Sequence, residues 1–356
     1  MKYLKYIALF GLLLFFNRLK AQGVGFPNES WGVAFGNSSR FDGLRFNFID
    51  RNIDLINGMN FTVWFNKDFT DHSGTFNGLG IGVPMAAGTA YRNGISTGIF
   101  GVGAGKKLIG FNLSGLAVGA GNEAIGLNLA GIAVGAGDNL TGFNIGGLAV
   151  GSGHNVTGFN FSALVVGAGD NLEGVNIAGL VTGAGQNVQG LNIGGLVVGA
   201  GDNINGFNAS VLVVGAGESI TGISVAGLVV GSGESLTGIN VAGLAVGSGG
   251  TLTGINLAGL AVGAPELKGL NIALAAGGEN VSGIAIAPAY FRIEDGEMKG
   301  LSVSAFNHIR GTLNGVSIGA FNYVNNINGV QIGILNYIRS NRKGLRLLPI
   351  FNARFN

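Results

Sequence analysis

The chain has 356 residues and a mass of 36.0 kDa, and 69 of its residues are glycine. Only 11% of the residues are charged, against about 25% in an average globular protein, whereas 47% are hydrophobic. This apolar content excludes a disordered chain, and the absence of a glycine at every third position excludes collagen. Cysteine is absent, so no disulfide can staple the fold.

The first 21 residues have the pattern of a secretory signal. Lys2 and Lys5 precede an apolar run of ten residues from Ile7 to Phe16, and Ala21 supplies a small residue at the end. At about 1.5 Å per residue, this run covers about half of a hydrocarbon core, which argues against a membrane anchor. The sequence therefore predicts export to the cell surface, the outer membrane or the periplasm.

Loss of residues 1–21 would change the charge of the chain. Four of the 20 basic residues lie in that segment, which leaves 16 basic and 18 acidic residues and a net charge of −2. Residues 108–267 contain eight acidic residues and no Lys or Arg. This sign is wrong for binding a phosphate backbone, so we expect no nucleic-acid partner.

A 16-residue repeat dominates the rest of the chain. Glycines followed by an apolar residue recur from Gly78 to Gly254, and all eleven successive intervals between them are 16 residues long. After Gly254 the intervals become irregular, and before Gly78 the repeat is faint. The sequence thus predicts four parts: a signal peptide (1–21), an N-terminal cap region (22–77), a regular repeat array (78–264), and degenerate repeats with a C-terminal cap (265–356).

Each unit has the pattern of one coil of an all-β parallel solenoid. Phe143 with Ile145, and Leu148 with Val150, alternate as in strands, but the two pairs are out of phase. A corner at the small residues between the pairs would turn both pairs toward one interior, where Leu140 adds a third side chain. We expect such coils to stack at a spacing of about 4.8 Å.

A glycine column is predicted to form a tight corner of positive φ in each coil. With this assignment, a β-branched residue at Gly151 would strain the corner, and Leu148→Ala would leave a cavity in the core. The column comprises Gly119, Gly135, Gly151, Gly167, Gly183, Gly199, Gly215, Gly231 and Gly247.

Two alternatives stay open at the level of sequence. A transmembrane outer-membrane β-barrel would suit the low charge and the aromatic Phe355 near the end, but the phase break within each unit spoils the outward alternation of a barrel strand. A functional amyloid would join stacked coils end to end, but the two ends of the array are its most divergent parts, which favours caps.

An asparagine recurs at one coil position and is interrupted only by Ser224. Amides that are stacked one coil apart can form hydrogen bonds along the array, so the sequence favours a structural ladder over a binding row. Its members are Asn112, Asn128, Asn144, Asn160, Asn176, Asn192, Asn208, Asn240 and Asn256.

No pattern of residues predicts catalysis, a metal or a cofactor. The G-x-G pattern recurs in every coil without the strand–loop–helix context of a dinucleotide loop. Turns such as Gly137-Asp138 supply too few carboxylates for calcium, and His72, His154 and His308 are far apart in the repeat frame. We expect a protein that is not an enzyme, and we identify no small-molecule substrate.

The second strand of the middle coils is a candidate partner surface. It reads Leu-Val-Val in several coils, and if the outer two residues point inward, the central valine points outward. Stacked valines would form an apolar stripe about 20 Å long, which favours self-association or packing on the cap region or on a membrane surface. The alternative is that valine merely favours strands. The stripe comprises Val165, Val181, Val197, Val213 and Val229.

The last units change to G-Φ-x-Φ-x-Φ-x-N, as in Gly300-Leu-Ser-Val-Ser-Ala-Phe-Asn307 and Gly315-Val-Ser-Ile-Gly-Ala-Phe-Asn322, and the chain closes with Gly344-Leu-Arg-Leu-Leu-Pro-Ile-Phe-Asn352. These motifs resemble those of Gram-negative (Bacteroidetes-like) glycine-rich surface-repeat proteins, over about residues 58–356. The resemblance implies an exported surface or outer-membrane protein and transfers no catalytic residues. With the repeat itself, it leads us to expect a structural or adhesive role.

Overall fold

The computed structural model describes residues 23–64 and 73–355. The predicted signal over 1–21 and His72 lie outside the described residues. The chain divides into two compact units, residues 1–160 and residues 161–356. Within the described ranges, no helix has the length and hydropathy needed to cross a membrane.

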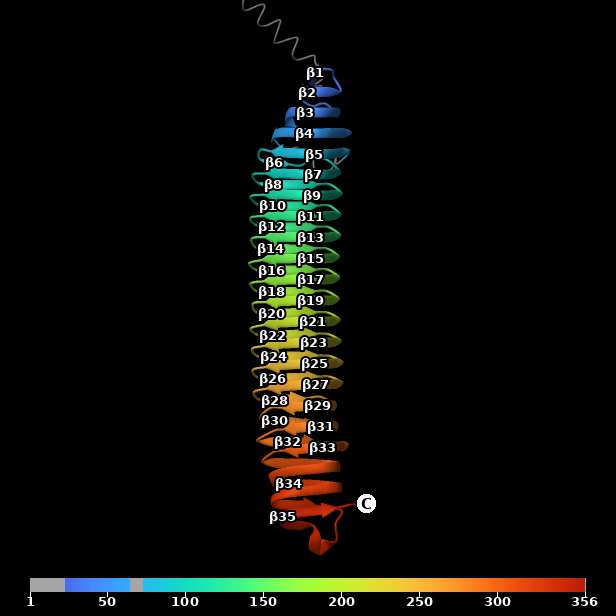
Figure 1. Ribbon diagram of the computed structural model, residues 1–356, viewed down its shortest axis with the longest axis vertical. Helices are drawn as coiled ribbons and strands as arrows, with labels where there is room; N and C mark the ends of the chain where they lie inside the picture. Colours follow the sequence, from blue (N-terminus) through green and yellow to red (C-terminus); the bar gives the residue numbers. More distant parts are fainter. Residues whose placement is uncertain (1–22, 65–72, 356) are drawn as a thin grey trace, which may run out of the picture. The chain divides into compact units, whose positions relative to one another are not determined.

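The first unit is a stack of β-coils, and from β5 onward each coil contributes one long and one short strand (Figure 1). Its strands are β1 (Val24–Pro27), β2 (Trp31–Phe35), β3 (Arg40–Ile49), β4 (Leu55–Trp64), β5 (Thr75–Gly82), β6 (Met85–Ala86), β7 (Tyr91–Gly98), β8 (Gly101–Ala104), β9 (Lys107–Ser114), β10 (Ala117–Ala120), β11 (Glu123–Ala130), β12 (Ala133–Ala136), β13 (Asn139–Gly146) and β14 (Ala149–Ser152). The division between the units falls within β15 (Asn155–Ser162).

The second unit has the same alternation of short and long strands, until they merge into the continuous β34. Its elements are β16 (Val165–Ala168), β17 (Asn171–Ala178), β18 (Val181–Ala184), β19 (Asn187–Gly194), β20 (Val197–Ala200), β21 (Asn203–Ser210), β22 (Val213–Ala216), β23 (Ser219–Ala226), β24 (Val229–Ser232), β25 (Ser235–Ala242), β26 (Ala245–Ser248), β27 (Thr251–Ala258), β28 (Ala261–Gly263), β29 (Glu266–Ile272), β30 (Ala275–Gly278), β31 (Asn280–Ile286), β32 (Tyr290–Ile293), β33 (Glu297–Val303), β34 (Phe306–Ile338), the 3-10 helix η1 (Lys343–Leu345) and β35 (Leu347–Arg354).

Equivalent residues of successive coils lie side by side. β11 pairs in parallel with β13, and Gly126 faces Gly142. In the second unit, β19 pairs in parallel with β21, and Asn192 faces Asn208. This parallel register, offset by one repeat unit, confirms the predicted solenoid. The barrel alternative is wrong for the described residues, because the strands of a membrane barrel pair antiparallel.

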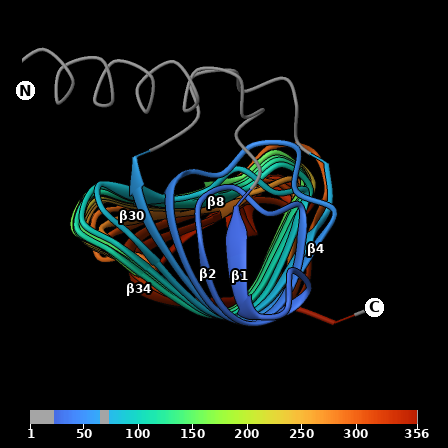
Figure 2. The same ribbon diagram turned by 90° about the horizontal axis from the view of Figure 1, so that it is seen from above.

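Each coil has three sides, which are visible when the stack is seen from above (Figure 2). The long strand covers two of them because it bends at a glycine of positive φ, 120° at Gly142 in β13 and 123° at Gly222 in β23. A Cβ at Gly222 would overlap the carbonyl oxygen of Gly206 in the preceding coil. The corner predicted at the Gly151 column is therefore wrong: Gly151 lies inside the short strand β14 and is not among the residues of positive φ.

The interior is narrow and receives one or two side chains from each side of the coil. Leu140 and Asn144 are 0% exposed and Val150 is 1% exposed. The inward positions predicted for Leu140 and Val150 are confirmed. The space between them is filled by asparagine and by small residues, which explains how so short a coil can close.

The inward positions predicted for three large apolar residues are wrong. Phe143 and Leu148 are 41% and 46% exposed, and Ile145 is half-buried. The cause is the alternation of a strand: because Asn144 turns inward to stack its amide, its two neighbours must turn outward.

We expect Val150→Ala to lower the free energy of unfolding more than Leu148→Ala, although leucine loses more atoms. The first change leaves a cavity in the closed interior and should cost about 2 kcal/mol, whereas the second trims a side chain that solvent already reaches and should cost less than about 1 kcal/mol. Urea unfolding of the two variants measures the difference, and equal losses would contradict this assignment of the core.

Antiparallel strand pairs lie at the start of the first unit and at the end of the second unit. The first pair is β1 with β2, and the second is β35 with β34. Pro27 removes a backbone donor from β1. The parallel stacking of coil on coil therefore stops at β2 and at β34. This interruption disfavours the end-to-end growth that the amyloid alternative requires.

Candidate interaction surface

The outward side chains of the long strands form two apolar columns in the second unit, which we call the apolar face. The columns extend over ten coils, from β17 to β34, and none of their 20 side chains is polar or charged. The first column is Val175, Leu191, Phe207, Ile223, Ile239, Ile255, Leu270, Ile284, Leu301 and Val316. The second is Ile177, Ile193, Ala209, Val225, Val241, Leu257, Ile272, Ile286, Val303 and Ile318.

Solvent reaches all of these side chains, which are half-buried or exposed. Ile223, Ile239 and Ile255 are each 40% exposed. At about 4.8 Å per coil and about 3.3 Å per residue, the apolar face is about 48 Å long and about 13 Å wide. A continuous apolar patch of this size marks an interaction surface in soluble proteins.

The valine stripe lies next to this face, beyond a corner that carries a column of leucines. Val165 and Val181 are 40% and 36% exposed, and Val197, Val213 and Val229 are half-buried. Leu164 at the corner is 39% exposed, so the inward orientation that the sequence predicts for it is wrong, whereas Val166 is fully buried as predicted.

The apolar face is the larger surface, and our sequence interpretation missed it. The signal was the asparagine at the position between the two apolar residues. Once that asparagine is placed in the interior ladder, the period of two in a strand places both of its neighbours outside.

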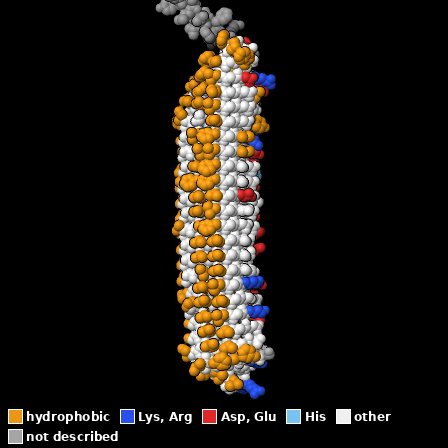
Figure 3. Space-filling view, in the orientation of Figure 1, with side chains coloured by type: hydrophobic (Ala, Val, Ile, Leu, Met, Phe, Trp, Pro, Cys, Tyr) orange, Lys and Arg blue, Asp and Glu red, His pale blue; other side chains and the backbone are white. Residues whose placement is uncertain are grey.

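Charged side chains gather at the other corner of the coil. Glu218 and Glu234 occupy the turn before the long strand, and Thr221 and Thr237 extend outward from the first half of β23 and β25. In the space-filling view, apolar columns run along the left of the visible face, and charges lie at its right edge (Figure 3). Each coil is therefore amphipathic across its width.

The interior asparagines form hydrogen-bonded runs, as the sequence predicts. In the first unit Asn112 donates from Nδ2 to Oδ1 of Asn128 at 2.9 Å, and the same bond links Asn128 to Asn144 and Asn144 to Asn160 at 2.8 Å. In the second unit one run joins Asn176, Asn192 and Asn208, and another joins Asn240, Asn256 and Asn271. Since these amides are buried and bonded to one another, they serve the fold.

Ser224 breaks the ladder of the second unit. Its hydroxyl has no partner among the described residues, and neither has Oδ1 of Asn240, while Nδ2 of Asn208 reaches only the carbonyl of Gly206 at 3.4 Å. The break thus leaves a donor and an acceptor facing each other across one coil.

We expect Ser224→Asn to raise the free energy of unfolding by about 1–3 kcal/mol. The new amide would accept from Asn208 and donate to Asn240, two hydrogen bonds to groups that are now poorly satisfied. Ser224→Ala is the matched control, because it removes the orphaned hydroxyl without closing the gap. A melting temperature no higher than that of Ser224→Ala would contradict the expectation.

A buried ionic cluster occupies the interior of the first coils. Asp50 accepts hydrogen bonds from Nη1 of Arg45 at 2.6 Å and from Thr62 at 2.8 Å, and Arg45 also bonds to Asn60 at 3.0 Å. Arg92 lies over the ring of Phe76 at 4.6 Å, and burial lowers its pKa to about 10, against the opposing effect of Asp50. Arg45 occupies the ladder position, opposite Asn60 of the next coil. We therefore assign the cluster to the fold.

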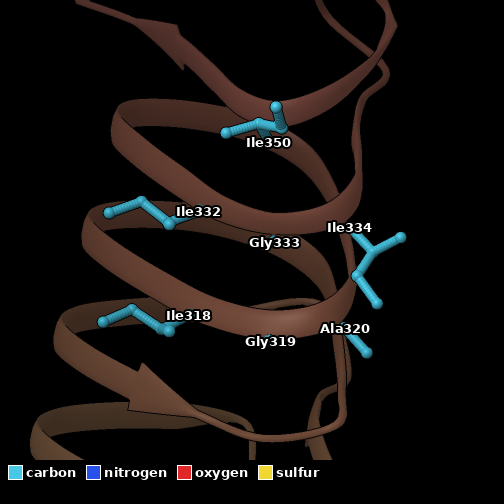
Figure 4. A pocket seen from close by; sticks show the side chains of 7 residues that line it. All are labelled: Ile318, Gly319, Ala320, Ile332, Gly333, Ile334 and Ile350. Carbon is cyan, nitrogen blue, oxygen red and sulfur yellow. The ribbon is translucent and has the colours of Figure 1, made fainter.

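An apolar groove of about 540 Å³ opens near the end of the second unit (Figure 4). Two isoleucines form one wall, two glycines form the floor, and Ile350 lies at one end with a φ of 65°, which is rare for a β-branched residue. Because Ile318 also belongs to the apolar face, the groove extends this face toward β35. Its lining is Ile318, Gly319, Ala320, Ile332, Gly333, Ile334 and Ile350.

The two described histidines lie in separate settings. Nδ1 of His154 is 3.3 Å from a carboxylate oxygen of Asp138 at an exposed turn. Nδ1 of His308 is 2.9 Å from the hydroxyl of Tyr290, and partial burial lowers the pKa of His308. In residues 23–64 and 73–355, no three side chains of His, Cys, Asp or Glu are grouped to hold a metal ion.

Comparisons of the chain with protein-family models, with curated proteins and with solved structures returned no match.

Proposed function

We propose that the chain is an exported, non-enzymatic surface repeat protein with a structural or adhesive role, and that it works through its apolar face. The observation that carries the proposal is an inversion of the usual arrangement: nine of the ten coils of the apolar face keep an asparagine or a serine inside, between two apolar side chains that point outward. A protein that acts alone in water gains nothing from leaving such side chains exposed. A protein that binds through this face gains the free energy of covering it.

The rest of the molecule supports a structural role. The long strands hold every outward side chain at one repeated spacing, and the interior amides bond coil to coil, so the face is flat and regular. Export is supported by the signal pattern in residues 1–21 and by the resemblance of the closing motif to those of surface-repeat proteins.

Location is tested with the full chain carrying a C-terminal epitope in a Gram-negative host. We expect the protein outside the inner membrane with a mass that corresponds to cleavage after Ala21, and we expect added protease to degrade it on intact cells. The control variant Leu12→Arg/Leu14→Arg interrupts the apolar run and should stay in the cytoplasm. An unprocessed chain that fractionates with cytoplasmic proteins would overturn the proposal.

A further inference from the structure

We infer that the apolar face of the second unit packs against the same face of a second copy of this chain. The inference rests on the proposed function in that it uses the same surface, and it adds the identity of the partner. Three observations carry it: the size of the face, its regular relief, and the kind of charge around it.

The apolar face is large enough for a stable dimer. Its length of about 48 Å and width of about 13 Å give a footprint of about 600 Å² per copy, or about 1,200 Å² for two copies. Specific interfaces begin at about this total. The flanking column of leucines, in which Leu164 and Leu196 are 39% and 38% exposed, extends the covered area further.

The relief of the face complements itself. Two rows of side chains repeat once per coil, from Val175 and Ile177 in β17 to Val316 and Ile318 in β34. A second copy has the same rows at the same spacing, so the ridges of one copy fit between those of the other. Sheets that pack in this way keep their strands nearly aligned and lie about 10 Å apart.

The surrounding charge favours a protein over a lipid surface. Residues 171–318, which span the apolar face, contain nine acidic and four basic residues, one Tyr and no Trp. Peripheral proteins that lie on anionic membranes place basic residues and interfacial aromatics beside their apolar face. Here the acidic turn that carries Glu218 and Glu234 would be repelled by anionic lipid, whereas two copies can meet with these turns at the outer rim.

The primary test is sedimentation of the processed full chain at 1–100 µM. The face variant is Ile223→Arg/Ile239→Arg, and the matched control is Thr221→Arg/Thr237→Arg, which adds the same charges on the same two strands beyond the glycine corner. We expect the parent and the control to be dimers, and the face variant to dissociate at least 100-fold more readily. Similar melting curves for the two variants, recorded at a concentration low enough for both to be monomeric, would show that the coils themselves are intact.

Cross-linking tests which faces of the two copies meet. The described residues include no cysteine, so an introduced cysteine is the intended site of reaction. If all ten coils overlap about a two-fold axis, the axis passes between the coils of Ile239 and Ile255. Ile239→Cys should then be joined to its own counterpart by a bismaleimide whose reach matches the separation of packed sheets, about 10 Å, whereas Thr237→Cys should not. Efficient cross-linking at Thr237→Cys alone would overturn the inference.

Two further outcomes separate the inference from the proposed function. A parent chain that is monomeric at 100 µM overturns the inference. If that monomer also floats with neutral phosphatidylcholine vesicles and Ile223→Arg/Ile239→Arg does not, the partner is a lipid surface and the apolar face keeps its role. A chain that dimerises through the face but is retained in the cytoplasm supports the inference and overturns the proposed export.

Discussion

Replacement of Gly222 by alanine should lower the free energy of unfolding by at least about 3 kcal/mol and the melting temperature by about 6–12 °C. Gly222 has a φ of 123°, a conformation that residues with a side chain rarely adopt. The added Cβ would also overlap the carbonyl oxygen of Gly206 one coil away. The Cβ is held in place by the backbone of its own coil and the oxygen belongs to the backbone of the neighbouring coil, so neither can move without disturbing the hydrogen-bonded stack.

Gly215→Ala is the matched control for this experiment. Gly215 lies in the short strand directly before β23, and its φ is not positive. A Cβ there would meet its nearest neighbours at 3.7 and 3.8 Å, an ordinary van der Waals distance. We expect its stability to differ from that of the parent by less than about 1 kcal/mol. If Gly215→Ala were as damaging as Gly222→Ala, glycine content rather than the corner would govern stability.

Asn192→Ala should cost about 2–4 kcal/mol in thermal or urea unfolding. Asn192 is fully buried, accepts from Nδ2 of Asn176 at 2.9 Å and donates to Oδ1 of Asn208 at 2.9 Å. The truncation removes both bonds and leaves a donor and an acceptor facing an apolar hollow.

The control for this change lies on the same strand. Asn187 in β19 belongs to an outer row of amides, where it donates to Asn171 at 2.8 Å and accepts from Asn203 at 3.1 Å, but it is only half-buried. Water can replace its partners, so Asn187→Ala should cost less than about 1 kcal/mol. Equal losses for Asn187→Ala and Asn192→Ala would show that the interior ladder has no special weight.

The repeat length and the ladder were predictable because in both cases the same residue type recurs at a fixed spacing in the sequence. An asparagine recurs at the same position of nearly every unit, so the amides of successive coils must lie one above the other. The orientation of Phe143 and Ile145 was not predictable from hydrophobicity. In a strand, either these two residues or Asn144 between them can face the interior, and in the structure Asn144 does so. The corner was ambiguous for a similar reason, since Gly142 and Gly151 recur equally and only φ distinguishes them.

The non-repeating parts escaped prediction for a different reason. The ion pair of Arg45 and Asp50, at 2.6 Å, depends on how the first coils depart from the repeat. The antiparallel pairing of β35 with β34 has no counterpart in the repeats, and among the described strands only β1 and β2 pair in the same way. The periodicity of the sequence predicts the structure of the repeated coils. It does not predict the end segments, because their sequences depart from the repeat.

The direction of the interior hydrogen bonds has an electrostatic consequence for the first unit. Asn112, Asn128 and Asn144 each donate toward the next coil, and the oxygens that accept, on Asn128, Asn144 and Asn160, point back toward the start of the chain. Aligned amides add their dipoles, as the peptide groups of a helix do, and the row acquires a negative end. The orphaned Oδ1 of Asn112 marks that end, and one coil before it lies the buried guanidinium of Arg92, bonded to Ser96 at 3.3 Å. The negative end of the ladder thus lies one coil from a buried cation, which is the orientation that electrostatics favours.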